Sequence, residues 1–256
     1  MSRERNVVIK TPEEIKIMRA GGHINALALD TVRQMVRPGI STAELDAAAE
    51  KVIRDHGGTP TFQGFPGPYP FPATLTISIN EELVHGIPGK RVLKSGDIVS
   101  VDCGTTYKGF VADSAFSVGV GKISKDAKRL LDVTKQALFE GIKQMRIGNR
   151  VGDISSAIQR YVEKHGYHVP REYSGHGVGR QMHEAPQVPN YGRAGRGLSL
   201  QEGITLAIEP MLLVGTYRTR VLADRWTVVS ADGSLTAHYE HSIVVTANGP
   251  SILTVL

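Results

Sequence analysis

DIVSVDCGTTYKGFVADSAFSVGV, residues 97–120, contains two strand-like segments on either side of the turn-rich GTTYKG. Their β-branched and alternating residues predict two β-strands, and the glycines predict that the chain reverses between them. A turn near Tyr107 and Lys108 would set Asp102 opposite Asp113. Facing carboxylates repel each other, so a folded protein keeps them where a cation or a shared proton lies between them. The pair therefore indicates a metal site, unless one aspartate is only a turn residue.

Two glutamates extend this acidic pair. Glu209 stands inside the apolar run LAIEPM, and Glu240 leads directly into the apolar run HSIVV. Glutamates are rarely buried without a partner, and Pro210 ends regular strand pairing where Glu209 would point into a site. Four such carboxylates on one face of a sheet would carry a formal charge of about −4, which two divalent cations would balance.

A histidine-containing segment offers a nitrogen ligand. YSGHGVGRQMHEAP, residues 173–186, contains His176 and His183. On a straight strand these two side chains would point to opposite faces, and three alternating glycines disfavour a helix. A glycine-bent loop would bring both histidines to one side, with His176 as the nitrogen ligand of the acidic cluster. A phosphate-binding loop is disfavoured, because no strand–loop–helix pattern surrounds these glycines.

Local signals predict the remaining elements. TPEE at 11–14 and the pair Ser41 and Glu44 are capping boxes, which predict two helix starts. The second of these helices ends at Gly57, and the proline-rich TFQGFPGPYPFPA, 61–73, is a loop. Further helices are predicted at about 124–146 and 153–165, and strands at 75–79, 97–102 and 113–120 and in ITLAIEPMLL, RWTVVSA and HYEHSIVVT.

Two similar segments suggest a duplicated plan. RPGISTAELDAAAEKVIRDHG, 37–57, and RIGNRVGDISSAIQRYVEKHG, 146–166, both open with Arg-x-Gly and close with His-Gly. Each predicts a capped amphipathic helix followed by a loop and strands, so we interpret the chain as two half-domains, the first ending near residue 122. Few positions are identical, and chance similarity is the alternative. The terminal His56 and His165 suit the negative end of a helix dipole.

Composition limits the class of protein. The 256 residues suit one large domain or two fused halves, and 41% hydrophobic with 21% charged residues is ordinary for a soluble globular protein. The N-terminus lacks the apolar core of a signal peptide, and no window approaches a membrane span. The single cysteine, Cys103, excludes a disulfide framework and suits a reducing cytoplasm. On its strand Cys103 would face away from Asp102.

Six motifs occur in order along the chain: HGIP with His85, VDCG with Asp102, ADSAFSVG with Asp113, GHGVGRQMHEAP with His176 and His183, IEPM with Glu209 and YEHSIVVT with Glu240. Together they resemble the methionine aminopeptidases in their short bacterial type I form, from about residue 7 to the C-terminus. The resemblance implies an α+β pita-bread (creatinase/aminopeptidase-like) fold, in which helices flank a curved antiparallel sheet. It also implies a single catalytic domain, 1–256, with two pseudo-symmetric halves of about 7–122 and 123–256.

The resemblance implies a metal-dependent hydrolase. Asp113 and Glu240 would bridge two divalent ions, Asp102 would bind one of them, and His176 with Glu209 would bind the other. A water held between the ions would attack the peptide bond, and Glu209 would act as its general base. The ions would be Co, Mn, Fe or Zn, and the oxygen-rich ligand set favours the first three over a thiolate-type zinc site.

Substrate contacts follow from the same resemblance. His85 would hydrogen-bond the substrate near the scissile amide, and His183 would help to stabilise the oxyanion. The free α-amine of the substrate would bind a metal, which restricts cleavage to the N-terminus. The loop GFPGPYPFP carries extra residues relative to the common family pattern, and near Thr76 a frequent family cysteine is replaced. The methionine pocket would be lined by Phe62, Phe65, Phe71, Thr76, Met182 and Trp226.

The sequence thus predicts a cytoplasmic, monomeric enzyme that removes the N-terminal methionine from nascent chains with a small second residue. The net charge of +5 and dispersed basic residues suggest transient ribosome contact rather than dedicated nucleic-acid binding, and no membrane association is expected.

Three alternatives compete with this prediction. The first is a relative that cleaves X-Pro bonds, such as prolidase or aminopeptidase P; these usually carry a large additional N-terminal domain, whereas this chain begins almost at the catalytic helices. The second is a non-enzymatic binding module on the same fold; such relatives lose metal ligands, and all five are kept here. The third is an RNA- or ribosome-binding protein, which rests only on the positive charge.

Overall fold

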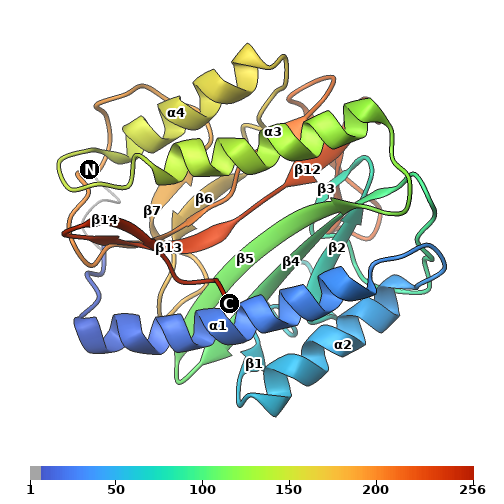
Figure 1. Cartoon of the computed structure of the whole chain (residues 1–256), viewed down its shortest axis with the longest axis horizontal. Helices are drawn as coiled ribbons and strands as arrows, with labels where there is room; N and C mark the ends of the chain where they lie inside the picture. Colours follow the sequence, from blue (N-terminus) through green and yellow to red (C-terminus); the bar gives the residue numbers. More distant parts are fainter. Residues whose placement is uncertain (1–6) are drawn as a thin grey trace.

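Two pairs of helices enclose a set of antiparallel strands (Figure 1). The structure is a computed structural model, and it describes residues 7–256. Helices α1 and α2 lie along one side of the molecule and α3 and α4 along the other, with the strands between them. The helices are α1, Pro12–Met35; α2, Thr42–Asp55; α3, Lys125–Ile142; and α4, Val151–Lys164. The predicted α+β class is confirmed.

The helix ends follow local signals. Thr11 caps α1 and Ser41 caps α2, and in each case a glutamate at the third helical position binds back to the cap. Helices α2 and α4 also end alike. His56 and His165 each donate from Nδ1 to the carbonyl four residues earlier, at 2.8 and 2.7 Å, and each is followed by a glycine with a φ of +77° or +80°. The two similar sequence segments therefore form helices of similar length and ending.

The second helix pair differs from the predicted bounds at the connection between its helices. Helix α3 ends at Ile142 rather than near residue 146, and α4 begins at Val151 rather than 153. The chain between them turns through Gly148, whose φ of +94° is incompatible with a continuing helix.

The first sheet lies against α1 and α2. Its strand β4 pairs with β5 along one edge and with β2 and the short β1 along the other, all antiparallel. Leu45 and Ile53 of α2 share a buried cluster with Leu75 and Val101 of the sheet. The strands are β1, Thr59–Pro60; β2, Leu75–Ile79; β4, Ile98–Tyr107; and β5, Phe110–Gly119.

The β4–β5 hairpin corrects one prediction. Its turn residues are Lys108 and Gly109, with φ of 47° and 79°, and Asp113 pairs with Gly104 rather than with Asp102. The predicted register was therefore wrong by two positions. Positive φ at both central residues is the pattern of a type I′ two-residue hairpin turn, which places the glycine inside the turn. The two aspartates still share a face of the sheet, because a shift of two positions preserves the side to which a side chain points.

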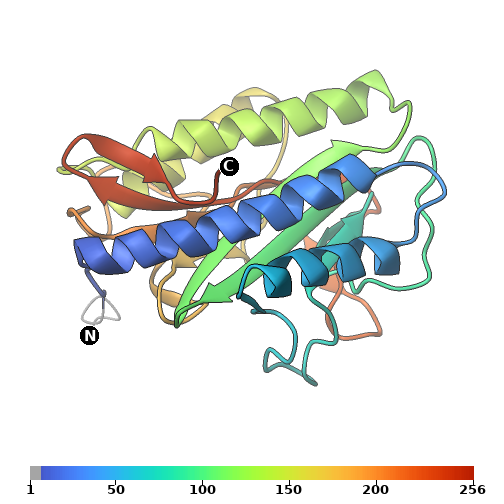
Figure 2. The same cartoon turned by 60° about the horizontal axis from the view of Figure 1, so that its bottom comes forward.

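The second sheet lies against α3 and α4. Its order is β14–β13–β8–β6–β7, all antiparallel. Beyond Glu209 and Glu240 the pair β8–β13 continues as β9–β12 in the same register. In both views the β13–β14 hairpin lies between α1 and α3 (Figures 1 and 2). The strands are β6, Ser174–Gly177; β7, Glu184–Pro189; β8, Thr205–Ile208; β9, Met211–Leu213; β12, Thr236–His238; β13, His241–Thr246; and β14, Gly249–Ile252.

A small third sheet positions His85 and Trp226 near the centre of the molecule. It consists of β3, Glu82–Val84, β10, Thr219–Val221, and β11, Val228–Ser230, in the order β10–β11–β3. His85 follows β3 directly, and Trp226 lies in the connection between β10 and β11.

The two large sheets join along β5 and the continuous strand β12–β13. The backbone of Glu240 pairs with that of β5 through hydrogen bonds of 3.0 and 3.3 Å. On one side of this bridge, Ser117 Oγ accepts from His238 N–H (2.9 Å) and donates to His238 O (2.7 Å). On the other side, Ser242 Oγ does the same for the backbone of Asp113, at 2.9 and 2.8 Å. Serine hydroxyls therefore take the place of backbone partners at both ends of this seam.

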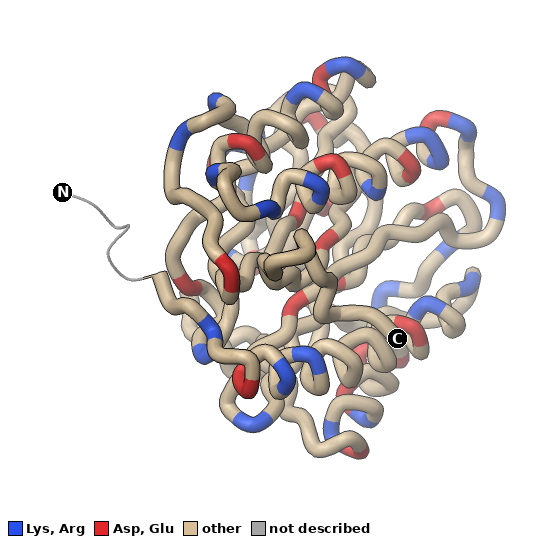
Figure 3. Tube along the Cα trace, turned by 60° about the vertical axis from the view of Figure 1, so that its left-hand side comes forward, with Lys and Arg blue, Asp and Glu red and all other residues tan. Residues whose placement is uncertain are grey.

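The exterior shows a mixture of charges. Lys and Arg residues are spread over the helices and loops of the described chain (Figure 3). Within residues 7–256, no helix has both the length and the apolar character needed to cross a membrane.

Candidate active site

One cavity of about 1040 Å³ gathers the predicted residues. Its walls come from strands of every sheet in the described chain and from the loop 61–73. Elements far apart in the sequence therefore build one site. Every residue that we assigned to metal binding, catalysis or the methionine pocket lines this cavity: Asp102, Asp113, His176, Glu209, Glu240, His85, His183, Phe62, Phe65, Phe71, Thr76, Met182 and Trp226.

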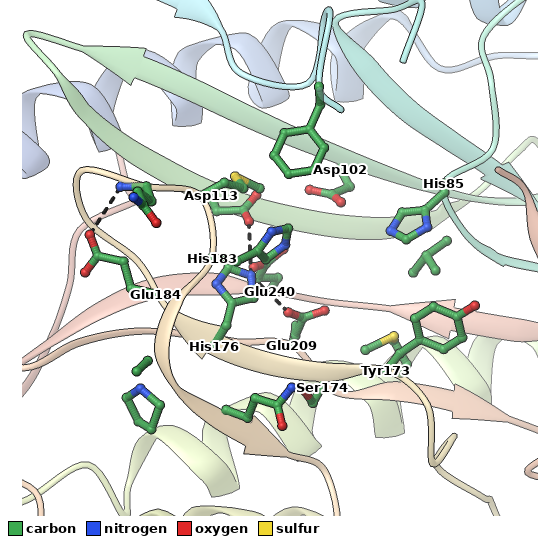
Figure 4. A pocket seen from close by; sticks show the side chains of 18 of the residues that line it. His85, Asp102, Asp113, Tyr173, Ser174, His176, His183, Glu184, Glu209 and Glu240 are labelled. Atoms are coloured by element: carbon green, nitrogen blue, oxygen red, sulfur yellow. Dashed lines mark hydrogen bonds and ion pairs between the residues drawn. The ribbon is translucent and has the colours of Figure 1, made fainter. Parts of the chain in front are cut away.

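Carboxylates converge on the imidazole of His176 in this cavity, with His183 beside it (Figure 4). His176 Nε2 lies 3.4 Å from Glu209 Oε1 and 3.7 Å from Asp113 Oδ2. Ligand atoms of Asp113, His176 and Glu240 all lie within 4.8 Å of one another, and all three residues are buried. Asp102 joins them from β4 and contacts the Asp113 carboxyl group. Atoms this close suit ligands of a shared ion, since metal–ligand bonds to these groups measure about 2.0–2.2 Å.

Burial dominates the electrostatics of the carboxyl groups. It raises the pKa of Asp102 to about 7. The pKa values of Asp113, Glu209 and Glu240 are raised well above the usual range, first by burial and then by neighbouring carboxylates. Ionisation is disfavoured because like charges in a low-dielectric site repel strongly. Without a cation, the cluster therefore keeps protons that exposed carboxyl groups lose at neutral pH.

The histidines of the site are neutral. Burial first and the neighbouring His183 second lower the pKa of His176 to about 4. Burial and His183 act in the same way on His85, whose pKa is also about 4. His176 Nε2 lies near the carboxyl oxygens of Glu209 and Asp113, and burial is still the largest influence on its pKa. Its Nδ1–H donates to Gly177 O at 2.9 Å. This bond leaves Nε2 free, in the tautomer that binds a metal.

Three buried oxygens of the cluster lack partners. Asp102 Oδ1, Asp113 Oδ1 and Glu240 Oε1 accept no hydrogen bond. Buried polar atoms are seldom left unpaired in folded proteins, and a divalent cation would satisfy all three. Carboxylate oxygens with one imidazole nitrogen suit first-row divalent metals. The residues present therefore fit a divalent metal centre.

An apolar pocket adjoins this cluster. Phe71 meets the Trp226 ring edge-on at 5.2 Å, and Phe65 meets the His183 ring at 5.5 Å. His183 in turn lies 4.4 Å from the His176 ring. Phe62 and Met182 belong to the same buried cluster as Phe71. The histidine pair thus stands between the acidic cluster and the aromatic wall.

The proline-rich loop packs directly on this wall. A Cβ added to Gly67 would lie 2.2 Å from Trp226 Cη2, so only glycine allows this approach. Tyr69 of the same loop donates to Asp224 O at 2.9 Å. Gly67 and Tyr69 of this loop therefore support the Trp226 side chain.

Cys103 faces away from the acidic cluster, as the strand alternation predicted. It is fully buried in the core between the first sheet and helices α1 and α2. Burial raises the pKa of its thiol. This environment favours a packed, unreactive cysteine.

His238 also lies at this cluster, although no sequence motif singled it out. It ends β12 and is 2% exposed, and its Nε2 lies 3.8 Å from both Glu209 Oε2 and Glu240 Oε2. Burial lowers its pKa to about 3. The available signal was its place two residues before Glu240, because alternate residues of a strand share one face.

A buried ion pair behind the His183 loop was also missed. Lys10 Nζ lies 2.5 Å from Glu184 Oε2, and the two side chains are only 2% and 8% exposed. Glu184 Oε1 also accepts from Gln181 N–H at 3.2 Å. The segment before α1 thus anchors the chain that carries His183. The partners are 174 residues apart in the sequence, so no local pattern indicated this contact.

Comparison with known proteins places the chain in a family. The model of metallopeptidase family M24 matches residues 16–247. A protein named methionine aminopeptidase from Clostridium perfringens is 49% identical over 250 residues, covering 98% of this chain and 99% of that protein. The chain belongs to the methionine aminopeptidases of family M24. Methionine aminopeptidase 1 of Bacillus subtilis is 48% identical and covers 97% of this chain and 99% of its own length.

Solved structures agree with this membership. The crystal structure of methionine aminopeptidase from Thermotoga maritima matches with a TM-score of 0.95 at 44% identity, covering 98% of this chain and 100% of that one. Prolidase from Pyrococcus furiosus matches with a TM-score of 0.79 at 22% identity and shares the fold. This chain covers only 66% of that prolidase. The predicted pita-bread fold and family resemblance are therefore confirmed.

Proposed function

We propose that this metallopeptidase removes the N-terminal methionine from nascent proteins and peptides, with a preference for a small second residue. One observation carries the proposal: a buried cluster of carboxylates and His176 adjoins an apolar aromatic pocket within one cavity. The cluster supplies hydrolytic chemistry, and the pocket suits an unbranched apolar side chain. Relatives named methionine aminopeptidase, of nearly equal length, support the same activity.

Two divalent ions would be held by five residues of the cluster. Asp113, His176 and Glu240, whose ligand atoms lie within 4.8 Å of one another, would hold them together with the neighbouring Asp102 and Glu209. Bound ions would lower the pKa of water and neutralise the negative charge of the ligands. Co, Mn, Fe and Zn all suit the ligand set.

The protein groups would divide the remaining work. Glu209, whose Oε1 faces His176 and whose Oε2 faces His238, would take the proton from the attacking water and pass it to the leaving amine. His183, between the cluster and Phe65, would donate a hydrogen bond to the developing oxyanion. His85, 6.3 Å from the Trp226 ring, would hold the substrate near the scissile amide.

The aromatic wall would select methionine. Phe62, Phe65, Phe71, Met182 and Trp226 present flat or flexible apolar surfaces, and a thioether makes favourable contacts with aromatic edges. Thr76 stands on β2 directly opposite Asp102. It would therefore mark the boundary between the pocket and the metal ligands.

Peptide cleavage followed by mass spectrometry tests the proposal. Metal-stripped protein is supplied with Mn, Co or Fe and then with Met-Ala-Ser, Met-Lys-Ser and Ala-Pro-Ser. We expect metal-dependent loss of methionine from Met-Ala-Ser alone. Cleavage of Ala-Pro-Ser instead would move the protein to the proline-specific branch of the fold. Tight metal binding without any cleavage would favour a binding module.

The cellular setting follows from the substrate. We infer that the enzyme acts as a monomer in the cytoplasm, where nascent chains present new N-termini, and that its net charge of +5 favours brief contact with ribosomes. Co-sedimentation with ribosomes should weaken as salt rises. Failure to co-sediment at any ionic strength would remove the ribosome contact and leave the peptidase activity untouched.

A further inference from the structure

His238 occupies an unusual position for a histidine. It is buried at the end of β12, and its Nε2 has no hydrogen-bond partner. The same atom lies 3.8 Å from Glu209 Oε2 and 3.8 Å from Glu240 Oε2. An unpaired imidazole nitrogen facing two carboxyl groups is costly in a structure without a use for it.

The seam between the sheets explains how His238 reaches this place. Glu240 sits at the centre of the seam, paired with the backbone of β5. Asp113 lies on one side of this bridge, held by Ser242, and His238 lies on the other side, held by Ser117. Asp113 stands two residues before Ala115, and His238 stands two residues before Glu240, the two residues paired at the bridge. The local two-fold symmetry of this antiparallel pair therefore relates Asp113 to His238. His238 stands at the position that corresponds to Asp113, which is a ligand candidate.

The same correspondence extends to the neighbouring strands. In the first sheet, Asp102 of β4 pairs with Ala115 of β5, and Ala115 is the residue that bridges to Glu240. In the continuous register of β8–β9 with β12–β13, Glu209 is the residue that falls opposite Glu240. Asp102 and Glu209 thus correspond, and each stands beside one of the pair Asp113 and His238.

The position of His238 suits a hydrogen bond to the carboxylate of Glu209. Glu209 lies between two imidazoles, with Oε1 3.4 Å from His176 Nε2 and Oε2 3.8 Å from His238 Nε2. When Oε1 binds a metal beside His176, the outer oxygen still needs a donor, and ligating carboxylates are usually hydrogen-bonded in this way. Asp102, Asp113 and Glu240 each contribute an unpaired carboxylate oxygen, and His238 contributes the unpaired nitrogen that faces Glu209 Oε2. His238 can therefore donate to this oxygen.

We propose that His238 is a positioning residue of the metal centre, whose Nε2–H donates to the outer oxygen of Glu209 and orients that carboxylate for metal binding. The inference rests on the proposed metal site. A contraction of the 3.8 Å separation to hydrogen-bond distance on metal binding is part of the proposal. His238 itself does not ligate the metal.

Three variants and the wild-type protein test the role. His238→Leu removes the donor, and His238→Gln keeps an N–H donor on a side chain of similar reach. His241→Leu is the matched control, because His241 is a half-buried histidine at the start of β13 whose Nδ1 hydrogen-bonds to Thr254 Oγ1 at 2.8 Å and which does not line the cavity. Metal affinity is measured by calorimetry, and the melting temperature is measured without metal.

We expect His238→Leu to lower metal affinity by about 10–100-fold, the usual effect of removing a partner of a ligand. His238→Gln should recover most of this loss, and His241→Leu should show none of it. Metal-free His238→Leu should melt no lower than the wild type, because it loses an unpaired polar atom. Nitrogen-15 NMR of the zinc-loaded wild type should show His238 Nε2 carrying a proton.

Several results would overturn the proposal. Unchanged metal affinity in His238→Leu, together with a lower melting temperature, would reduce His238 to a packing role. An NMR signal of a metal-bound Nε2 would make it a direct ligand. If the wild-type protein binds no metal, the proposed function fails as well, whereas a wild type that binds metal and a leucine variant that binds equally well would defeat this inference alone.

Discussion

At the scale of the residue, the active site is a concentration of unfavourable contacts. Burial raises the pKa values of Asp102, Asp113, Glu209 and Glu240, and neighbouring carboxylates raise those of the last three further. A group of this kind destabilises the metal-free fold, since each carboxyl group must stay protonated or remain as an unpaired charge. Bound divalent cations would stabilise the ionised carboxylates and so remove this destabilisation. The residues are therefore adapted to the bound state.

Glu209→Gln tests the proposed general base. The amide keeps an oxygen for the metal but cannot accept the proton of the attacking water. We expect metal to be largely retained and turnover of Met-Ala-Ser to fall by about 10²–10⁴-fold, the usual contribution of general-base catalysis. Glu172→Gln, at an exposed carboxyl group lining the same cavity, should be nearly silent. Full activity of Glu209→Gln would remove Glu209 from this role.

Metal affinity should depend on pH through the carboxyl groups. Burial raises the pKa of Asp102 from 3.8 to about 7, so this group stabilises the metal-free fold below pH 3.8 and loses that contribution as the pH rises through about 7. A metal must displace the proton below that pH. The pKa of His176 is about 4, so this ligand releases no proton near neutrality.

Affinity should therefore rise by about tenfold per pH unit for each displaced proton between pH 5 and 7. Calorimetry in buffers with different ionisation enthalpies measures the released protons. Binding that releases no proton at pH 6 would show that Asp102 is already ionised in the metal-free protein.

At the scale of the element, strand register decides which carboxyl groups meet. The β4–β5 hairpin sets Asp113 opposite Gly104 because its turn places Lys108 and Gly109 at positive φ. Local chemistry alone thus controls a relation between two strands of ten residues each. A change of one position would move Asp113 to the opposite face of the sheet.

Gly109→Ala tests the turn. Gly109 has a φ of +79°, and its nearest neighbour, Arg180 Nη1, lies 3.9 Å from an added Cβ, so the cost is conformational rather than a clash. We expect a loss of about 1–2 kcal/mol in the free energy of unfolding, measured with urea. Gly89→Ala is the matched control, because an added Cβ there meets nothing within 4 Å and its φ is not left-handed. Equal stabilities of the two variants would contradict the observed turn.

At the scale of the whole molecule, the site is the place where the two sheets meet. Asp102 and Asp113 come from the sheet covered by α1 and α2, whereas His176, Glu209 and Glu240 come from the sheet covered by α3 and α4. A cation bound by both groups links the two sheets across the seam. Metal binding should therefore stabilise the whole fold.

A metal at a hundredfold excess over its dissociation constant should add about 2.7 kcal/mol to the free energy of unfolding. For a chain of this size the melting temperature should then rise by about 5–10 °C. Differential scanning calorimetry with and without a chelator measures the shift. The double variant Asp113→Asn with Glu240→Gln removes two negative charges from the site and should abolish most of the shift. An equal rise in that variant would place the stabilising metal elsewhere.

The sequence by itself determined the features that depend on neighbours along the chain. Capping boxes at Thr11 and Ser41 set helix starts, and alternation set the faces of Asp102 and Cys103, because backbone geometry links residues a few positions apart. The order of motifs carrying His176, Glu209 and Glu240 was enough to predict the composition of the site. Only the tertiary structure decided the serine-bridged seam, the Lys10–Glu184 pair and the place of His238. These depend on contacts between distant segments, which form through packing and are not encoded in any local pattern.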